Sequence, residues 1–259
     1  MTFILLLLFA APTAESIIQR AIAVDKELTP IQNQYAFTLE IRNQQVEKDG
    51  KLGAIDTKTF DVMFLEGGQY QKLILINGKP LPPDKQKKVD QEMEKTRAER
   101  RKARHSGLTH IERSLDLGGL AETLKYFDSK VTGEETLRGH LTWVVESTPK
   151  ADYKPSGKSQ EEIMSWRHKA WFDQKDGVQM QLQSTTIRPV NGFQPGSEYV
   201  WEYDPGPEQV WLLRKVTAKV EMSIYKMIHG RVNTLQTYTN YKKFDVASTI
   251  TTGYEVKKP

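Results

Sequence analysis

Residues 139–150 read GHLTWVVESTPK, and this stretch decides the expected fold. In an extended chain, Leu141, Trp143 and Val145 point to one side, whereas the opposite side is mostly polar. Pro149 has no N–H to give to a β-ladder, so the strand is expected to stop there. The pattern predicts a β-strand with one apolar face and one polar face.

The same alternation recurs on both sides of this stretch, in segments joined by short turns rich in Gly, Asp and Pro. About ten strands are expected, the clearest at residues 34–43, 57–65, 70–76, 139–150, 169–173, 178–183, 199–203, 210–224 and 234–244. No strand–helix–strand alternation is present, so a parallel sheet is not expected. The fold class is therefore mainly β: a single curled antiparallel sheet, exposed on one side and covered elsewhere by a few helices.

Four helical segments interrupt this pattern. Residues 15–28 carry an apolar stripe at helical spacing and are expected to end at Thr29 and Pro30. Residues 82–105 form one long, highly charged helix, and residues 115–127 a short helix that runs into a strand, with residues 133–139 as a connection. Residues 159–166 predict a helical turn with Ser159 as N-cap and Glu162 completing a capping box.

The composition fits one large domain. The chain has 259 residues, of which 38% are hydrophobic and 27% charged, which suits a sheet-rich body with much solvated surface. We assign residues 15–250 to this single domain, including the charged helix 82–105, and residues 251–259 to a tail. The chain has no cysteine, which excludes disulfides, thiolate metal sites, cysteine nucleophiles and an N-terminal lipidated cysteine.

The N-terminus has the features of an export signal. Residues 3–11 read FILLLLFAA, an apolar run too short to span a bilayer but of the length of a signal-peptide core that ends in small residues. Residues 1–14 are therefore predicted to be a signal peptide, with a buried N-terminal helix or strand as the alternative.

The helix at 82–105 carries the whole net charge of the protein. Between Asp84 and Arg104 there are nine Lys or Arg and five Asp or Glu, a surplus of four, and the chain as a whole has a net charge of +4. One interpretation is a solvated face held by Val89 and Met93. The other is a basic surface for anionic lipid headgroups or an acidic partner, with the candidate contacts Lys95, Arg97, Arg100, Arg101 and Arg104.

No catalytic motif is present. The five histidines show no HExxH pattern, and the chain has no nucleophile elbow, no Gly-rich phosphate loop and no EF-hand loop. We therefore predict no metal, no cofactor and no catalytic residue, although distant residues can still form a site in the folded chain. Nucleic-acid binding is not expected, because a basic helix that carries five acids is a poor match for phosphates.

All five tryptophans lie between Trp143 and Trp211. Aromatic side chains commonly fill the core of β-proteins, and they also line apolar pockets. The sequence does not separate these two interpretations.

The order of motifs resembles a known superfamily. The segment ILINGKPL at 74–81 runs into the charged helix, and the pattern G-x-L-x-W-V-V-x-x-x-P-K follows at 139–150. KAWFD at 169–173 and YKKF at 241–244 complete the series. Across residues 35–246, the chain resembles the periplasmic outer-membrane lipoprotein-sorting proteins and lipoprotein carriers.

The resemblance implies an incomplete antiparallel β-barrel around an apolar cavity lidded by helices. It also implies non-catalytic binding of the acyl chains of a lipid or lipoprotein in the periplasm of a Gram-negative bacterium. The chain departs from a minimal carrier in its greater length and in the charged helix, which is too polar to plug such a cavity. The expected cavity wall is Phe37, Leu39, Ile41, Trp143, Val145, Met180, Leu182, Trp201, Val220 and Met222.

Two other hypotheses stay open. The same fold could serve as an interaction or regulatory module of the cell envelope, with the charged helix as the partner surface and the cavity filled by side chains. An enzyme with a site assembled from distant residues is the third.

Overall fold

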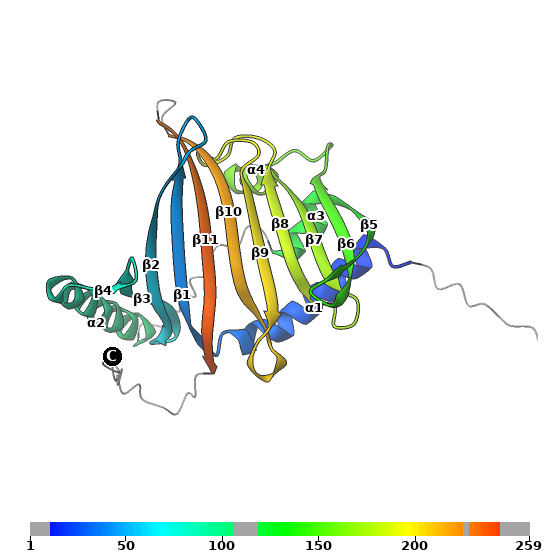
Figure 1. Ribbon diagram of the computed structural model, residues 1–259. Coiled ribbons are helices and arrows are strands. Elements are labelled where there is room, and N and C mark those ends of the chain that lie inside the picture. Colours follow the sequence, from blue (N-terminus) through cyan, green and yellow to red (C-terminus); the bar gives the residue numbers. More distant parts are fainter. Residues whose placement is uncertain (1–10, 106–118, 225–227, 244–259) are drawn as a thin grey trace, which may run out of the picture.

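The computed structural model describes residues 11–105, 119–224 and 228–243 (Figure 1). Most of the predicted signal peptide 1–14 and all of the predicted tail 251–259 lie outside these residues, so both stay predictions. The domain boundaries at 15 and 250 also stay predictions.

The described residues form one antiparallel sheet of eleven strands, which curls but does not close. Its order is β4-β3-β2-β1-β11-β10-β9-β8-β7-β6-β5, so the last strand pairs with the first and the chain otherwise meanders. The predicted fold class is confirmed. The strands are β1 Tyr35–Val46, β2 Leu52–Leu65, β3 Gly68–Ile76, β4 Lys79–Pro80, β5 Phe127–Leu137, β6 His140–Pro149, β7 Trp166–Asp173, β8 Gln179–Thr186, β9 Glu198–Pro205, β10 Trp211–Ile224 and β11 Ile228–Lys243.

The opening stretch forms β6, which ends at Pro149 as predicted. The prediction that residues 133–139 only connect two elements was wrong, because β5 continues through Gly133 to Leu137 and pairs with β6. A shift in register between Val131 and Gly133 marks a bulge there. A bulge adds a residue to one strand without ending the ladder, and this hides the alternation in the sequence.

Helix α1, Ala14–Gln32, begins after Thr13, whose hydroxyl oxygen accepts a hydrogen bond of 3.1 Å from the Ser16 N–H. The predicted end at Thr29 and Pro30 was wrong, since Pro30 lies inside the helix. Proline in the last turn removes a single backbone donor. The Asn33 N–H closes that turn with a 3.0 Å hydrogen bond to the Thr29 carbonyl.

The predicted capping box at Ser159 was also wrong. Helix α4, Lys158–Ile163, begins one residue earlier, after Gly157, and has no side-chain cap at its N-terminus. Ser159 is inside the first turn. Gly157 is an acceptable N-cap because its backbone adopts the required extended conformation easily.

Helix α1 and the short α3, Leu120–Tyr126, cover one face of the sheet, and α1 extends from β5 to β10 (Figure 1). We call this the inner face. A core cluster forms where the apolar stripe of α1 meets β6 and β7. It contains Ala14, Ile17, Ile18, Ala21, Val145, Ala170 and Phe172.

Further along α1, Val24 and Leu28 pack against a second cluster on β8 and β10. Two polar side chains also tie this helix to the sheet. Arg20 donates to the carbonyl of Gln174 at 3.0 Å, and Gln32 donates to the carbonyl of Trp211 at 2.6 Å. The helix is therefore attached by apolar packing, by a hydrogen bond from Arg20 in its first half and by one from Gln32 at its C-terminal end.

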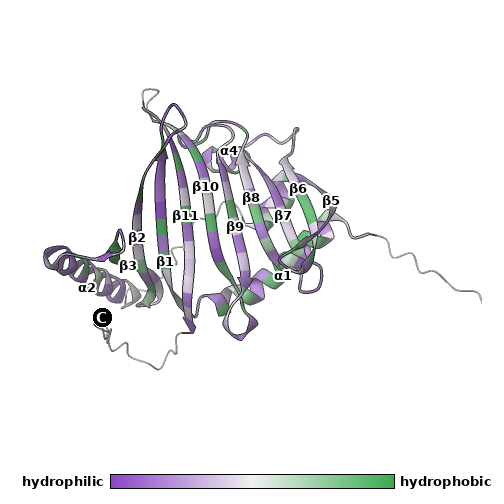
Figure 2. Ribbon diagram, in the orientation of Figure 1, coloured by the Kyte–Doolittle hydropathy of each residue, from purple (hydrophilic) through white to green (hydrophobic). Residues whose placement is uncertain are grey.

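The charged helix is α2, Pro83–His105, which lies beyond β3 at one edge of the sheet (Figure 1). Figure 2 shows it as almost entirely hydrophilic, with Met93 as its buried apolar residue. Arg100 fixes its second half, since the guanidinium donates 2.9 Å hydrogen bonds to the carbonyls of Leu65, Gly68 and Gln69 in the β2–β3 turn.

Arg100→Ala is expected to detach the end of α2 from the β2–β3 turn. Hydrogen bonds to a charged group contribute about 2 kcal/mol, which corresponds to amide hydrogen exchange about 30-fold faster in this part of α2. Hydrogen exchange read by mass spectrometry measures this. The matched control is Lys95→Ala on the same helix, whose side chain is exposed. Equal exchange in the two variants would contradict the anchoring role.

Candidate functional site

The expected wall residues share the inner face. Directly paired residues in an antiparallel sheet lie on the same face, and alternate residues of a strand do too. Leu182 pairs with Trp201, and Trp201 pairs with Val216. Val216 pairs with Gln236, which pairs with Ile41. A single row on the inner face therefore runs from β8 to β1.

The other expected residues join this row by alternation or by packing. On β6, Val145 belongs to the cluster beneath α1 and Trp143 packs against it. On β8, Met180 belongs to the cluster that Val24 and Leu28 of α1 cover. Alternation along β1 and β10 adds Phe37, Leu39, Val220 and Met222.

These residues do not all have the same surroundings. Val145 and Met180 are fully buried, with 1% and 0% of their surface exposed, so they are packed core beneath α1. Leu182 and Trp201, by contrast, line a cavity. The inner face is therefore packed core at some positions and cavity wall at others.

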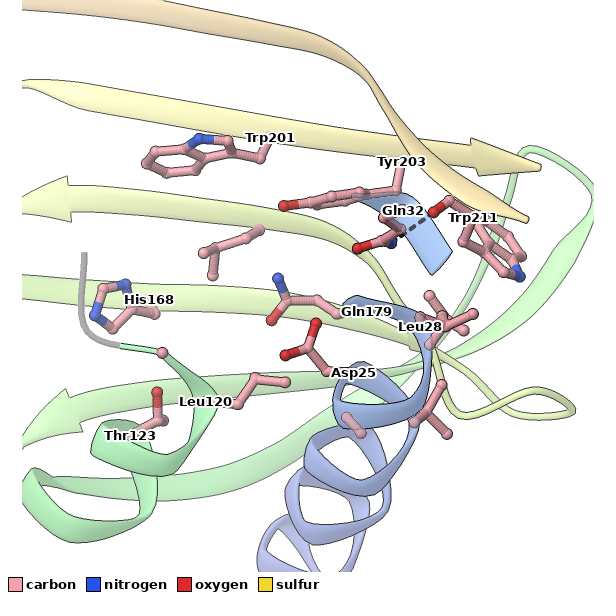
Figure 3. Close-up of a pocket in the computed structure, with 15 residues that line it drawn as sticks. Asp25, Leu28, Gln32, Leu120, Thr123, His168, Gln179, Trp201, Tyr203 and Trp211 are labelled. Atoms are coloured by element: carbon pink, nitrogen blue, oxygen red, sulfur yellow. Dashed lines mark hydrogen bonds between the residues drawn. The ribbon is translucent and has the colours of Figure 1, made fainter. Parts of the chain in front are cut away.

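The cavity, of about 260 Å³, lies between α1, α3 and strands β7 to β10 (Figure 3). Helix α1 contributes one side, α3 closes another, and the sheet forms the floor. Its apolar lining consists of Ala21, Val24, Leu28, Leu120, Val178, Leu182, Trp201 and Trp211.

Polar side chains also face the cavity, and two of them are held neutral. Burial lowers the pKa of His168 to about 4, and its Nδ1 lies 2.8 Å from the hydroxyl of Ser184. Burial, with a smaller effect from Asp25, raises the pKa of Tyr203 to about 12. Near neutral pH, neither ring carries a charge. Figure 3 shows Asp25 on α1 pointing toward Gln179.

The buried imidazole of His168 makes stability depend on pH. The unfolded chain binds this proton near pH 6.5, whereas the folded chain binds it only near pH 4, so the unfolded state holds more protons between these values. The free energy of unfolding is therefore expected to rise with pH from about 4 to 6.5, by about 3 kcal/mol from this residue.

Urea unfolding of the protein and of His168→Gln across this pH range measures the effect. Glutamine keeps a partner for Ser184 but has no titrating proton, so the difference in unfolding free energy between the two proteins should change by about that amount. A constant difference from pH 4 to 6.5 would contradict it.

Sequence reasoning missed several lining residues. His168, Tyr203 and the α1 residues were not among the expected wall, because no local pattern tells which part of the sheet a helix covers. The tryptophans could have indicated the cavity, because Trp201 and Trp211 line it. Trp171, on β7, instead donates from Nε1 to Glu135 at 2.8 Å.

The expected wall residues on β1 and β10 lie outside this cavity. Leu39 and Val220 are buried, whereas Ile41 is half-buried. The ring of Phe37 contacts those of Tyr238 and Tyr241, with centroids 5.5 and 5.2 Å apart. This half of the inner face is lined by aromatic and aliphatic side chains together.

The five basic residues expected to contact headgroups or a partner have different surroundings. Lys95 is exposed, while Arg97 pairs with Glu94 on α2 at 2.8 Å. Arg100 is occupied by backbone carbonyls, as above, and Arg101 pairs with Glu66 at 2.6 Å. The side chain of Arg104 lies outside what the structure describes.

The described residues contain neither a cluster of metal ligands nor a membrane-spanning helix. No three His, Asp or Glu side chains in the described ranges are grouped so that they could hold a metal ion. None of the helices in those ranges is both long enough and apolar enough to cross a membrane.

Comparison with known proteins gave structural neighbours only. No family model and no curated protein matches the chain. A LolA superfamily protein from Nitrosomonas europaea is similar at 10% identity and a TM-score of 0.38, over 91% of this chain and 96% of that one. A DUF1329 family protein from Desulfovibrio piger is similar at 11% identity and a TM-score of 0.40, over 92% and 96%.

A putative outer membrane lipoprotein-sorting protein domain from Vibrio parahaemolyticus is similar at 8% identity and a TM-score of 0.40, over 90% and 95% of the two chains. At such low identities and TM-scores, what the chain binds has to be inferred from its own residues.

Proposed function

We propose that this chain is an exported, non-catalytic binding protein that holds an acyl chain of a lipid or lipoprotein. The binding site is the space between α1, α3 and the inner face of the sheet, and the compartment is the periplasm of a Gram-negative bacterium. The observation that carries the proposal is the cavity of about 260 Å³ lined by Leu28, Leu120, Leu182, Trp201 and Trp211.

The cavity of about 260 Å³ lies under α1 and α3, so a long acyl chain is expected to displace one of these helices from the sheet as it enters. The contacts of Arg20, in the first half of α1, and of Gln32, its last residue, would resist this movement.

The energetics favour the uncharged hydrocarbon part of a ligand inside the cavity. Each buried methylene contributes about 0.8 kcal/mol, so a chain of eight or nine methylenes is held by apolar contact alone. His168 and Tyr203 are neutral and add no charge to the lining, in which Asp25 supplies a carboxylate.

Titration with a fluorescent fatty acid tests the proposal. We expect the probe to bind one site and to be displaced by unlabelled palmitate, because both would compete for the same apolar lining. Short-chain butyrate, which buries few methylenes, should displace it poorly. Absence of saturable binding, or equal displacement by butyrate and palmitate, would contradict an acyl-chain site.

A second candidate function is an interaction module of the cell envelope that uses α2. This is favoured by the position of α2 beyond the sheet edge and by its exposed Lys85, Lys87, Lys88 and Lys95 (Figure 1). Changing these four lysines to Glu is then expected to abolish the capture of an acidic partner, while fatty-acid binding is unchanged. The matched control changes them to Arg, which keeps the charge, and loss of capture in that control would contradict a charge-based surface.

A further inference from the structure

A second pocket, distinct from the cavity beneath α1, lies where β6 ends, β7 begins and β8 ends. Its volume is about 550 Å³. The segment that follows β6 forms one wall with Tyr153, and Met164, at the C-cap of α4, contributes an apolar side chain. It shares no lining residue with the cavity beneath α1.

Three basic side chains from three separate parts of the sequence line this pocket: Lys150, Arg167 and Arg188. No Asp or Glu lines it. Within the described ranges, none of the three forms an ion pair with a carboxylate. Lys150 donates to the carbonyl of Lys125 at 3.0 Å, and Arg188 donates from one terminal nitrogen to the carbonyl of Met164 at 2.5 Å.

Those backbone contacts hold Lys150 and Arg188 in place. They leave the other N–H donors of both side chains available to a ligand. An ammonium group has three donors and a guanidinium has five, so one hydrogen bond leaves most of each group unused. Two cations elsewhere on the sheet have an acid partner: Arg138 lies 2.7 Å from Asp204, and Arg214 lies 2.8 Å from the same carboxylate. The three positive charges of the pocket, by contrast, have no carboxylate partner among the residues that the structure describes.

We propose that this pocket binds a phosphate group. Positive charges that share one pocket repel one another. A bound anion attracts each of them and so offsets that repulsion. A guanidinium presents paired N–H groups that match two phosphate oxygens, and Lys150 adds a point charge. Ile187, 45% exposed, adds apolar surface at the same pocket for the carbon part of a phosphate ester. The phosphate could come from a lipid headgroup or from a free phosphate.

The test is calorimetric titration of the full chain with inorganic phosphate and, separately, with vesicles of phosphatidylglycerol or phosphatidylcholine. The test variant is Arg167→Gln with Arg188→Gln. The matched control is Lys48→Gln with Lys51→Gln, which removes the same charge from the exposed β1–β2 turn. We expect phosphate to bind the unaltered chain and the control equally, and the test variant at least tenfold more weakly. Arg167→Lys keeps the charge but loses the paired N–H groups of the guanidinium. Its affinity for phosphate should lie between those of the unaltered chain and the test variant.

The vesicle arm separates the two sources. Binding to phosphatidylglycerol vesicles that inorganic phosphate competes away assigns the pocket to a lipid headgroup. Phosphate binding without vesicle binding assigns it to a free phosphate. The proposal is overturned if neither ligand binds, if the control loses as much affinity as the test variant, or if acetate binds as tightly as phosphate. Circular dichroism and the thermal midpoint check that each variant is folded. If the double variant does not fold, Arg167→Gln alone is compared with the control in its place.

Discussion

Leu182→Trp is expected to weaken the binding of a long-chain fluorescent fatty acid by about 100-fold. Leu182 lines the cavity at the centre of β8, with Trp201 beside it on β9. An indole in place of the isobutyl group would occupy the space that the ligand needs. If it displaces about four methylenes at about 0.8 kcal/mol each, the loss is about 3 kcal/mol, or about two orders of magnitude in the dissociation constant.

The control for this substitution introduces the same indole on the opposite face. Ile55 is 54% exposed and pairs with Gln44, which alternates with the inner-facing Ile41 along β1. Ile55→Trp should leave the affinity unchanged. Unaltered affinity in Leu182→Trp, with the fold intact, would mean that the acyl chain binds elsewhere.

Phe172→Ala is expected to lower the free energy of unfolding by about 3–5 kcal/mol. Phe172 has 1% of its surface exposed and belongs to the cluster in which Ile17 and Ile18 of α1 meet the sheet. Removing the ring would leave a void that the neighbouring β-strands cannot collapse to fill, because their ladders fix the backbone. Urea unfolding measures the change.

Leu52→Ala is the matched control, since Leu52 is 55% exposed at the start of β2 and should change stability by less than about 0.5 kcal/mol. A small effect of Phe172→Ala would contradict the interpretation of this part of the inner face as packed core. It would indicate instead that α1 rests loosely on the sheet.

The strands were predictable from sequence because their apolar residues alternate with period two. Segments such as 178–183 and 199–203 became β8 and β9 with small changes at their ends. The antiparallel order followed from the short turns. The bulge at Gly133 was not predictable, because an extra residue breaks the alternation without breaking the strand.

Predictions from the local sequence also failed where contacts between distant segments determine the structure. Pro30 predicts a helix end, but the Gln32 side chain holds the last turn of α1 against Trp211. Arg100 was expected to meet headgroups, whereas the fold brings it to the carbonyls of the β2–β3 turn. Neither contact leaves a trace in the local sequence, because the partners are 179 and 32–35 residues apart.

The sequence predicted which face of the sheet carries the candidate site, but not which part of that face lines the cavity. Alternation identified Leu182 and Trp201 as possible wall residues, and both line the cavity. It did not separate them from Val145, which α1 covers completely. The polar lining comes from α1, α3 and three strands at once, so no spacing in the sequence could have assembled His168 with Tyr203.

The most direct test of acyl-chain binding is native mass spectrometry of the full chain, purified without detergent from the periplasm of a Gram-negative host, with analysis of its organic extract. The proposed function predicts a mass increment that matches one acyl-bearing lipid in the extract, present in the Ile55→Trp control and lost in Leu182→Trp. A ligand-free mass for the unaltered chain, with no lipid in the extract even after incubation with fatty acid, would contradict it.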